Sequence, residues 1–130
     1  HIKFVSLEVN AGSVEKAEAK LKIEINDKVE NTKINGNGPV DATFNAIKKL
    51  TNTEYKLKLY QVNAITAGTD AQGEVTVRLE DHDLSSQAKG SDPDIIVASA
   101  KAYINALNRL IFKKSKSIKE NSSHLEIRGV

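Results

Sequence analysis

Cysteine is absent from the sequence and histidine is scarce, and these two facts exclude several kinds of chemistry. Without cysteine the chain has no disulfide, no thiol nucleophile and no thiolate zinc site. The three histidines, His1, His82 and His124, are scattered, and no two have the spacing of a helical metal site. The sequence Asp81-His82-Asp83 is typical of a solvated surface turn. We therefore expect no metal site and no catalytic cysteine.

Long apolar runs and a large excess of one charge are also missing. The 130 residues are 39% apolar and 28% charged, with a net charge of +2. This balance is typical of one globular domain and argues against a protein held to nucleic acid by phosphate contacts. The single basic cluster, "FKKSKSIK" (112–119), follows an expected helix, whose C-terminal end favours cations. Since no stretch approaches the ~20 apolar residues of a membrane span, we expect neither a nucleic-acid nor a membrane partner.

Motifs for nucleotide binding and for nucleophilic catalysis are not found either. The stretch "GNGP" (36–39) lacks the lysine of a phosphate-binding loop and the third glycine of a dinucleotide-binding motif. Ser99 is not part of a G-x-S-x-G motif. We therefore assign no catalytic residue, no metal and no cofactor to this domain, and we expect it to be non-catalytic.

The chain instead contains two copies of one structural plan. Each copy begins with a segment that contains the motif V-N-A, continues with a run in which apolar and polar residues alternate, and then becomes polar. Alternation with a period of two predicts half-buried strands, and each polar stretch is expected to return as a third, shorter strand. The segments are 5–12, 17–25 and 26–35 in the first copy, and 59–66, 73–81 and 81–89 in the second.

Each copy ends in a stretch with glycine and proline, followed by a helical pattern. Proline suits the first helical position because its missing N–H costs nothing there. With Pro39 and Pro93 in that position, Gly38 and Asp92 become the expected N-caps. Apolar residues then recur with helical spacing. They are Val40, Phe44, Ile47 and Leu50 in the first helix, and Ile96, Ala100, Tyr103, Leu107 and Leu110 in the second.

The predicted fold class is therefore α+β, with two pseudo-symmetric βββα units, mostly antiparallel strands and two helices packed against them. Residues 113–130 lose the periodicity and form a polar C-terminal tail, which predicts a frayed end or a linker. The chain opens at His1 within an expected strand, which indicates a piece of a longer protein.

A stretch of small residues with little charge, "NAITAGTDAQGEV" (63–75), lies between two expected strands. One interpretation is a glycine-rich hairpin loop. The other is a pocket wall, because small residues let a ligand or a second chain approach the backbone closely. The two helix starts would then supply N–H donors for a small carboxylate. Without lysine or arginine in those starts, an amino acid or organic acid fits better than a nucleotide.

Three segments, in the same order, resemble the C-terminal regulatory domain of 2-isopropylmalate synthases. They are "NGNGPVDATFNAI" (35–47), "YQVNAITAGTDAQGEVTVRLE" (60–80) and "SDPDIIVASAKAYINALNRL" (91–110). The resemblance covers about residues 3–112, so that residues 1–112 are expected to form an allosteric regulatory domain. Enzymes of this family are acetyl-CoA-dependent acyltransferases of leucine biosynthesis. The resemblance implies a cytoplasmic homodimer whose N-terminal catalytic barrel, with its divalent metal and acetyl-CoA, is not in this sequence.

The resemblance also implies feedback inhibition by leucine, bound between paired regulatory domains. The residues implied for effector binding are Val40, Leu57, Tyr60, Ala64, Asp70, Ala71, Gly73 and Ile95, with helix-start N–H donors at Gly38 and Asp92. The ammonium group of the effector needs carbonyls or a carboxylate. Asp70 is the expected carboxylate, and Asp41 and Asp94 are further candidates if they face the pocket.

Two alternatives stay open. Citramalate synthase shares this architecture and responds to isoleucine, which differs from leucine in the position of one methyl group. An apolar pocket discriminates such pairs by only ~1–3 kcal/mol. The segments "ITAGTDAQGEV" (65–75) and "SDPDIIVASAKAY" (91–103) are most similar to 2-isopropylmalate synthase, which favours leucine. The second alternative is a dimerisation scaffold that binds no effector.

Overall fold

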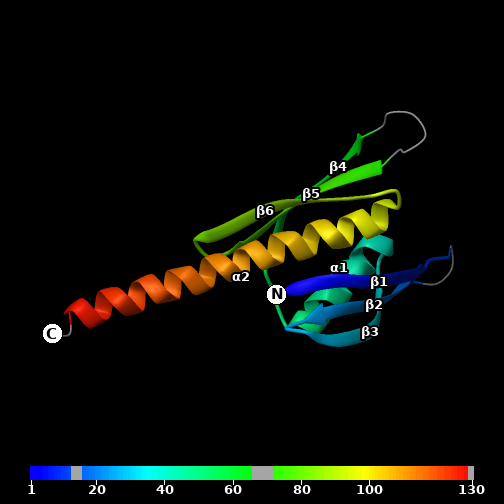
Figure 1. Cartoon of the computed structure of the whole chain (residues 1–130). Coiled ribbons are helices and arrows are strands. Elements are labelled where there is room, and N and C mark those ends of the chain that lie inside the picture. Colours follow the sequence, from blue (N-terminus) through cyan, green and yellow to red (C-terminus); the bar gives the residue numbers. More distant parts are fainter. Residues whose placement is uncertain (13–15, 66–71, 129–130) are drawn as a thin grey trace.

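The computed structural model of the chain is an α+β structure in which three strands and a helix occur twice (Figure 1). The structure describes residues 1–12, 16–65 and 72–128. In chain order, the elements are β1 (Ile2–Asn10), β2 (Ala17–Ile25), β3 (Lys28–Gly36), α1 (Pro39–Thr51), β4 (Lys56–Ile65), β5 (Gln72–Asp81), β6 (Leu84–Asp92) and α2 (Ile95–Arg128). The predicted fold class, with two βββα units, is confirmed.

Each unit folds its three strands into an antiparallel sheet, in the order β1-β2-β3 or β4-β5-β6. The expected shorter third strand is wrong for the first unit, where β1 and β3 both have nine residues, whereas in the second unit β6 has nine residues and β4 has ten. A tight two-residue turn precedes each third strand. Asn26 and Asp27 have φ values of 49° and 68°, and His82 has 53°. Such a turn starts the pairing as soon as the central strand ends.

The internal repeat extends to an irregularity in the first strand of each unit. Val5 is bulged out of the pairing between β1 and β2, and Lys58 is bulged out of the pairing between β4 and β5. Both residues lie four positions before the valine of the V-N-A motif. An extra residue shifts the alternation of side chains by one. In β4 it places Leu57 and Tyr60, three positions apart, on the same face of the sheet.

The two helices cover the inner faces of the sheets and form the core with them. α1 packs on β2 and β3, α2 packs on β5 and β6, and the helices also contact each other (Figure 1). Alternate residues of the central strands are buried, as the period-two pattern predicted. The buried residues include Ala19, Leu21, Ile23, Val75, Val77 and Leu79 of the strands, and Phe44, Ile47, Ala100, Tyr103, Leu107 and Leu110 of the helices.

Two glycines lie where a strand passes directly beneath a helix. A side chain at Gly36 would meet the backbone of Ala42 in the first turn of α1. A side chain at Gly90 would meet the backbone of α2 at Ala98 and Ala102. Only glycine permits such a close approach. These glycines therefore serve helix packing, in addition to preceding the helix starts.

α2 continues far beyond the predicted helix, as a long rod in Figure 1. The expected frayed end or linker after residue 112 is wrong for 113–128, because the helix runs to Arg128. Neither glycine nor proline occurs between residues 95 and 128, so no residue in this segment breaks the helix. Lys114 fixes the start of the extension, since its Nζ lies 2.7 Å from Oδ2 of Asp81 in β5.

Part of α2 is long and apolar enough, by composition, to cross a membrane. This part is Ile95–Glu120, and half of its most apolar window is buried inside the domain. The buried side chains of this part pack on β5 and β6, whereas Ile111, Phe112 and Ile118 are exposed. The core therefore accounts for the buried half of this apolar window, and the expectation of no membrane partner stays a prediction.

Candidate functional site

The start of α1 offers backbone donors. Gly38 is the N-cap, as predicted, and its carbonyl oxygen accepts a hydrogen bond of 2.9 Å from the Ala42 amide. Gly38 has no side chain to cap the first turn, and no side-chain cap is found among the described residues. Asp41 turns back over the helix start, where its Oδ2 accepts a hydrogen bond of 2.7 Å from the Asn37 amide. Because Pro39 has no N–H and the Ala42 amide is paired, the first-turn amides without a partner among the described contacts are those of Val40 and Asp41.

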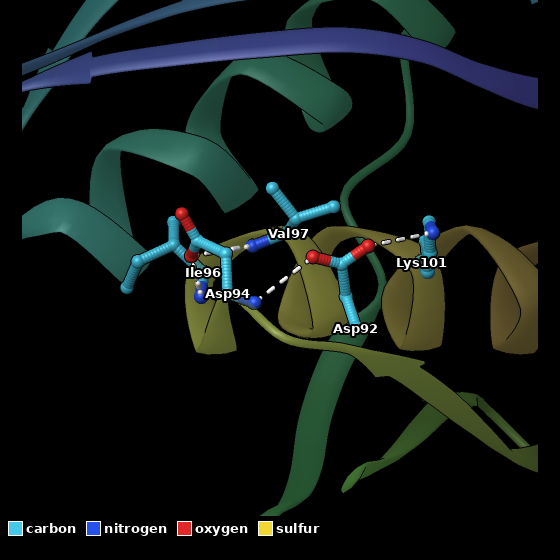
Figure 2. A network of polar contacts seen from close by, with 5 residues as sticks. All are labelled: Asp92, Asp94, Ile96, Val97 and Lys101. Atoms are coloured by element: carbon cyan, nitrogen blue, oxygen red, sulfur yellow. Dashed lines mark hydrogen bonds and ion pairs between the residues drawn. The ribbon is translucent and has the colours of Figure 1, made fainter. Parts of the chain in front are cut away.

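The start of α2 is capped differently from the prediction, as Figure 2 shows. Oδ1 of Asp94 accepts hydrogen bonds from the amides of Ile96 (2.7 Å) and Val97 (3.3 Å), and its carbonyl oxygen accepts one from Ala98. Asp94 is therefore the N-cap, and the assignment of Asp92 to that position is wrong. The reason is that Asp92 still pairs with β5 at the end of β6, which delays the helix by two residues.

Asp92 instead supports the loop that leads into α2. Its Oδ2 accepts a hydrogen bond of 2.9 Å from the Asp94 amide, and its Oδ1 lies 3.0 Å from Nζ of Lys101 (Figure 2). The hydrogen bond from Asp94, together with Lys101, holds the pKa of Asp92 below its usual value. Asp94 and Asp41 are likewise engaged in helix starts, so neither is placed as a dedicated partner for an ammonium group.

The apolar residues predicted for the effector site come from three elements. Tyr60 of β4 lies opposite Val77 of β5, so that its side chain points toward the helices. Its ring packs edge-to-face on Phe44 of α1, with ring centroids 5.7 Å apart. Phe44 lies one turn after Val40, which brings the predicted α1 residue to the same side of the helix.

The first turn of α2 contacts the same residues of the second sheet. A Cβ atom on Gly73 of β5 would overlap the Cδ1 atom of Ile95, so these two predicted residues are in contact. Ser99, one turn after Ile95, lies 2.7 Å from the hydroxyl oxygen of Tyr60. The structure therefore brings Tyr60, Gly73 and Ile95 together around the first turn of α2.

The remaining predicted residues are less tightly placed. Leu57 lies on the same face as Tyr60, across the bulge, and 42% of its surface is exposed. Ala64 pairs with Gly73 at the end of β4. Asp70 and Ala71 lie outside the described residues, so the part of the predicted site that they form is not described. Among the described residues, no group of three His, Cys, Asp or Glu side chains could hold a metal ion.

The inner face of β4 is the uncovered part of the second sheet. α2 packs over β5 and β6, whereas β4 makes its extensive contacts with β5 alone. Val62, which faces the same side as buried Val75, is 46% exposed, and Leu57 is similar. Leu57 and Val62 thus form an open apolar wall on β4. Tyr60 lies between them in the strand and contacts the first turns of α2 through Ser99.

Two residues of this site, Ser99 and Phe44, were not among the predicted site residues. Ser99 is fully buried, although serine is usually exposed. Its position among Ala98, Ala100 and Ala102 places it on the small-residue part of α2, a pattern that indicates close packing but no partner. Ser99 and Tyr60 are 39 positions apart in the sequence, so no local pattern predicts their contact.

Comparison with known proteins identifies the family. Residues 1–111 match the family model described as the LeuA allosteric (dimerisation) domain. The chain is 45% identical over 128 residues to a 2-isopropylmalate synthase of Rhodopseudomonas palustris (strain TIE-1), covering 98% of this chain and 24% of that protein. It is 52% identical over 115 residues to a 2-isopropylmalate synthase of Afipia carboxidovorans, covering 88% and 22%. The chain thus spans about a quarter of the length of these curated relatives. It belongs to the family of LeuA allosteric (dimerisation) domains, as the resemblance had implied.

Proposed function

We propose that this domain binds leucine as a feedback effector of a 2-isopropylmalate synthase and contributes to the homodimer of that enzyme. The observation that carries the proposal is the meeting of Tyr60, Gly73 and Ile95 beside an open apolar wall, in a chain of the allosteric (dimerisation) family. The acyl transfer itself, with acetyl-CoA and a divalent metal, belongs to a catalytic barrel outside this chain.

The apolar residues predicted for the effector site suit a branched aliphatic side chain. Val40, Leu57, Tyr60 and Ile95 are apolar or largely apolar, and all are partly exposed, so a ligand can reach them. Burying a leucine-sized side chain is worth about 1.5–3 kcal/mol. No charged side chain reaches the Tyr60 hydroxyl among the described contacts, which favours an aliphatic over a polar effector side chain.

The polar groups of the effector need donors and acceptors. The uncapped first-turn amides of α1, after Gly38, are proposed to bind the carboxylate, because α2 already satisfies its first amides with Asp94. The backbone around Ala71 and Gly73, with Asp70, is proposed to bind the ammonium group. Of the two predicted helix-start donors, Gly38 is therefore retained and Asp92 is not.

A second copy of the chain is proposed to cover the inner face of β4. Leu57 and Val62 expose 42% and 46% of their surface on a face that is buried in the neighbouring strand β5. Exposed apolar faces of this kind mark interaction sites, and closed symmetric dimers are the commonest homo-oligomers. Covering β4 in this way would also enclose the open side of the effector site.

Calorimetric titration of this chain with leucine, isoleucine and valine tests effector binding. We expect saturable binding with leucine ahead. Isoleucine ahead would move the assignment to the citramalate synthase type, and no binding by the folded chain would leave a dimerisation scaffold. Ile95→Ala should weaken binding at least about five-fold by shortening the wall, whereas Val29→Ala, at an exposed valine of β3, should not.

Sedimentation velocity tests the dimer surface separately. Val62→Lys places a charge on the inner face of β4 and should convert a dimer into monomers. Val29→Lys is the matched control, because Val29 is 55% exposed in the other sheet. Equal dimerisation of both variants would contradict the proposed surface without touching the effector proposal.

A further inference from the structure

We infer that Ser99 is a positioning residue of the effector site, which holds Tyr60 against the first turn of α2 and thereby determines effector affinity and selectivity. This inference rests on the proposed effector function. Ser99 is fully buried, and it contacts two residues of the proposed site, Tyr60 and Ile95.

The direction of the hydrogen bonds follows from counting protons. Oγ of Ser99 lies 2.8 Å from the carbonyl oxygen of Ile95 and 2.7 Å from the hydroxyl oxygen of Tyr60. A serine hydroxyl has one proton, and a carbonyl oxygen can only accept. Ser99 therefore donates to Ile95, and Tyr60 donates to Ser99. These two hydrogen bonds join β4 to the first turn of α2, and each hydroxyl group donates its one proton to one of them.

This connection is a direct link between β4 and α2, in addition to the pairing of β4 with β5. Among the described residues, the hydrogen bond from Tyr60 to Ser99 is the one that joins a β4 side chain to α2. On either side of Tyr60, Leu57 and Val62 are 42% and 46% exposed and are not held by the helix. Without Ser99 the Tyr60 ring keeps its edge-to-face contact with Phe44 but loses its fixed hydroxyl.

The same connection reaches Ile95 in the first turn of α2. Ile95 contacts Gly73 through its side chain, and its carbonyl is bound by Ser99. Because Ser99 lies one turn after Ile95 in α2, its bond to Tyr60 holds the Tyr60 hydroxyl at a set distance from the turn that carries Ile95. Leucine and isoleucine differ by the position of one methyl group, so a fixed distance between these walls is what selectivity between them requires.

Four variants of the chain test this role by calorimetric titration with leucine and isoleucine. In Ser99→Ala, the dissociation constant of the better effector should rise about five-fold, as expected for one buried hydrogen bond. The ratio of the dissociation constants of the two amino acids should also move toward one. Tyr60→Phe should act similarly, and the double variant should be no worse than either single variant, because both remove the same bond. Ser99→Thr retains the hydroxyl and should restore binding to within about two-fold.

Ser86→Ala is the matched control. Ser86 is also a buried serine, and its hydroxyl donates to a carbonyl of α2, that of Ala106, at 2.5 Å. Its substitution should lower stability without changing affinity or selectivity. If the parent chain binds an effector and Ser99→Ala binds it with unchanged affinity and selectivity, Ser99 has only a structural role and the inference is overturned. If the parent chain binds neither amino acid, the proposed function itself fails, which is a different result.

Discussion

Gly90 of β6 lies directly beneath Ala102 of α2, so that a methyl group on Gly90 would overlap the amide nitrogen of Ala102. The carbonyl oxygen of Ala98 would be only 2.6 Å from the same methyl group. These are backbone atoms of a packed helix, and they cannot move aside as the end of a flexible side chain can. The contact between the second sheet and its helix therefore depends on the absence of a side chain at this position.

Gly90→Ala should lower the free energy of unfolding by about 1–3 kcal/mol or more, because α2 must shift to admit the methyl group. Urea unfolding followed by circular dichroism measures this change. Gly12→Ala is the control, since no described atom outside the chain neighbours of Gly12 lies within 4 Å of the added methyl group. Equal stability of the two variants would contradict the described approach of β6 to α2.

The capping of α2 gives a prediction that separates Asp94 from Asp92. Asp94→Ala removes the acceptor of the Ile96 and Val97 amides and should cost about 1 kcal/mol of stability. Asp94→Asn should cost much less, because asparagine is an equally good N-cap. Asp83→Ala, at an exposed turn position without a described hydrogen bond, should have no effect. A larger loss in Asp92→Ala than in Asp94→Ala would favour the cap position expected from Pro93.

Tyr103 provides a prediction of the opposite sign. Its side chain is fully buried against Phe44, with ring centroids 4.6 Å apart, and its hydroxyl has no hydrogen-bond partner among the described residues. An unpaired buried hydroxyl is costly. Tyr103→Phe should therefore leave the free energy of unfolding unchanged or raise it by about 1 kcal/mol. A clear loss of stability in urea unfolding would show that the hydroxyl has a partner.

The same residue predicts an alkaline limit to stability. Burial, with a contribution from the charge of Glu54, raises the pKa of Tyr103 from 10.0 to about 12. The unfolded chain loses this proton first, so the contribution of Tyr103 is fully present below pH 10 and is lost as the pH rises through 12. A difference of two pKa units corresponds to roughly 2–3 kcal/mol. Urea unfolding between pH 9 and 12 should show a steeper loss for the parent chain than for Tyr103→Phe.

Asp92 predicts a loss of stability in acid. The Asp94 amide and Lys101 hold the pKa of Asp92 below 3.8, so the stabilising contribution is present above that pH and is lost as the pH falls through the folded-state pKa. In Asp92→Asn this part of the pH dependence should disappear. The check is urea unfolding at pH 5 and pH 2.5, with Asp83→Asn as the control. An identical pH dependence in the parent chain and Asp92→Asn would contradict the prediction.

Several features that depend on neighbours in the sequence were predicted correctly, although the helical extension over 113–128 was not. Alternation placed Leu21 and Val77 in the core, because side chains of a strand alternate between two faces wherever the strand lies. Gly38 before Pro39 marked the start of α1, because the fixed φ of proline is a property of the residue itself. The duplicated plan followed from the same local patterns, repeated once.

Features that depend on distant segments were decided by the tertiary structure. Asp94 and not Asp92 is the N-cap of α2, because Asp92 is still paired with β5 in the sheet. The hydrogen bond between Tyr60 and Ser99 forms because α1, β4 and α2 meet, and the open face of β4 exists because α2 packs over β5 and β6 instead. Local residue order sets dihedral preferences and which side of an element is apolar. Which elements pack on each apolar side is set by the free energy of packing the whole chain. The candidate site is formed where α1, β4 and α2 meet.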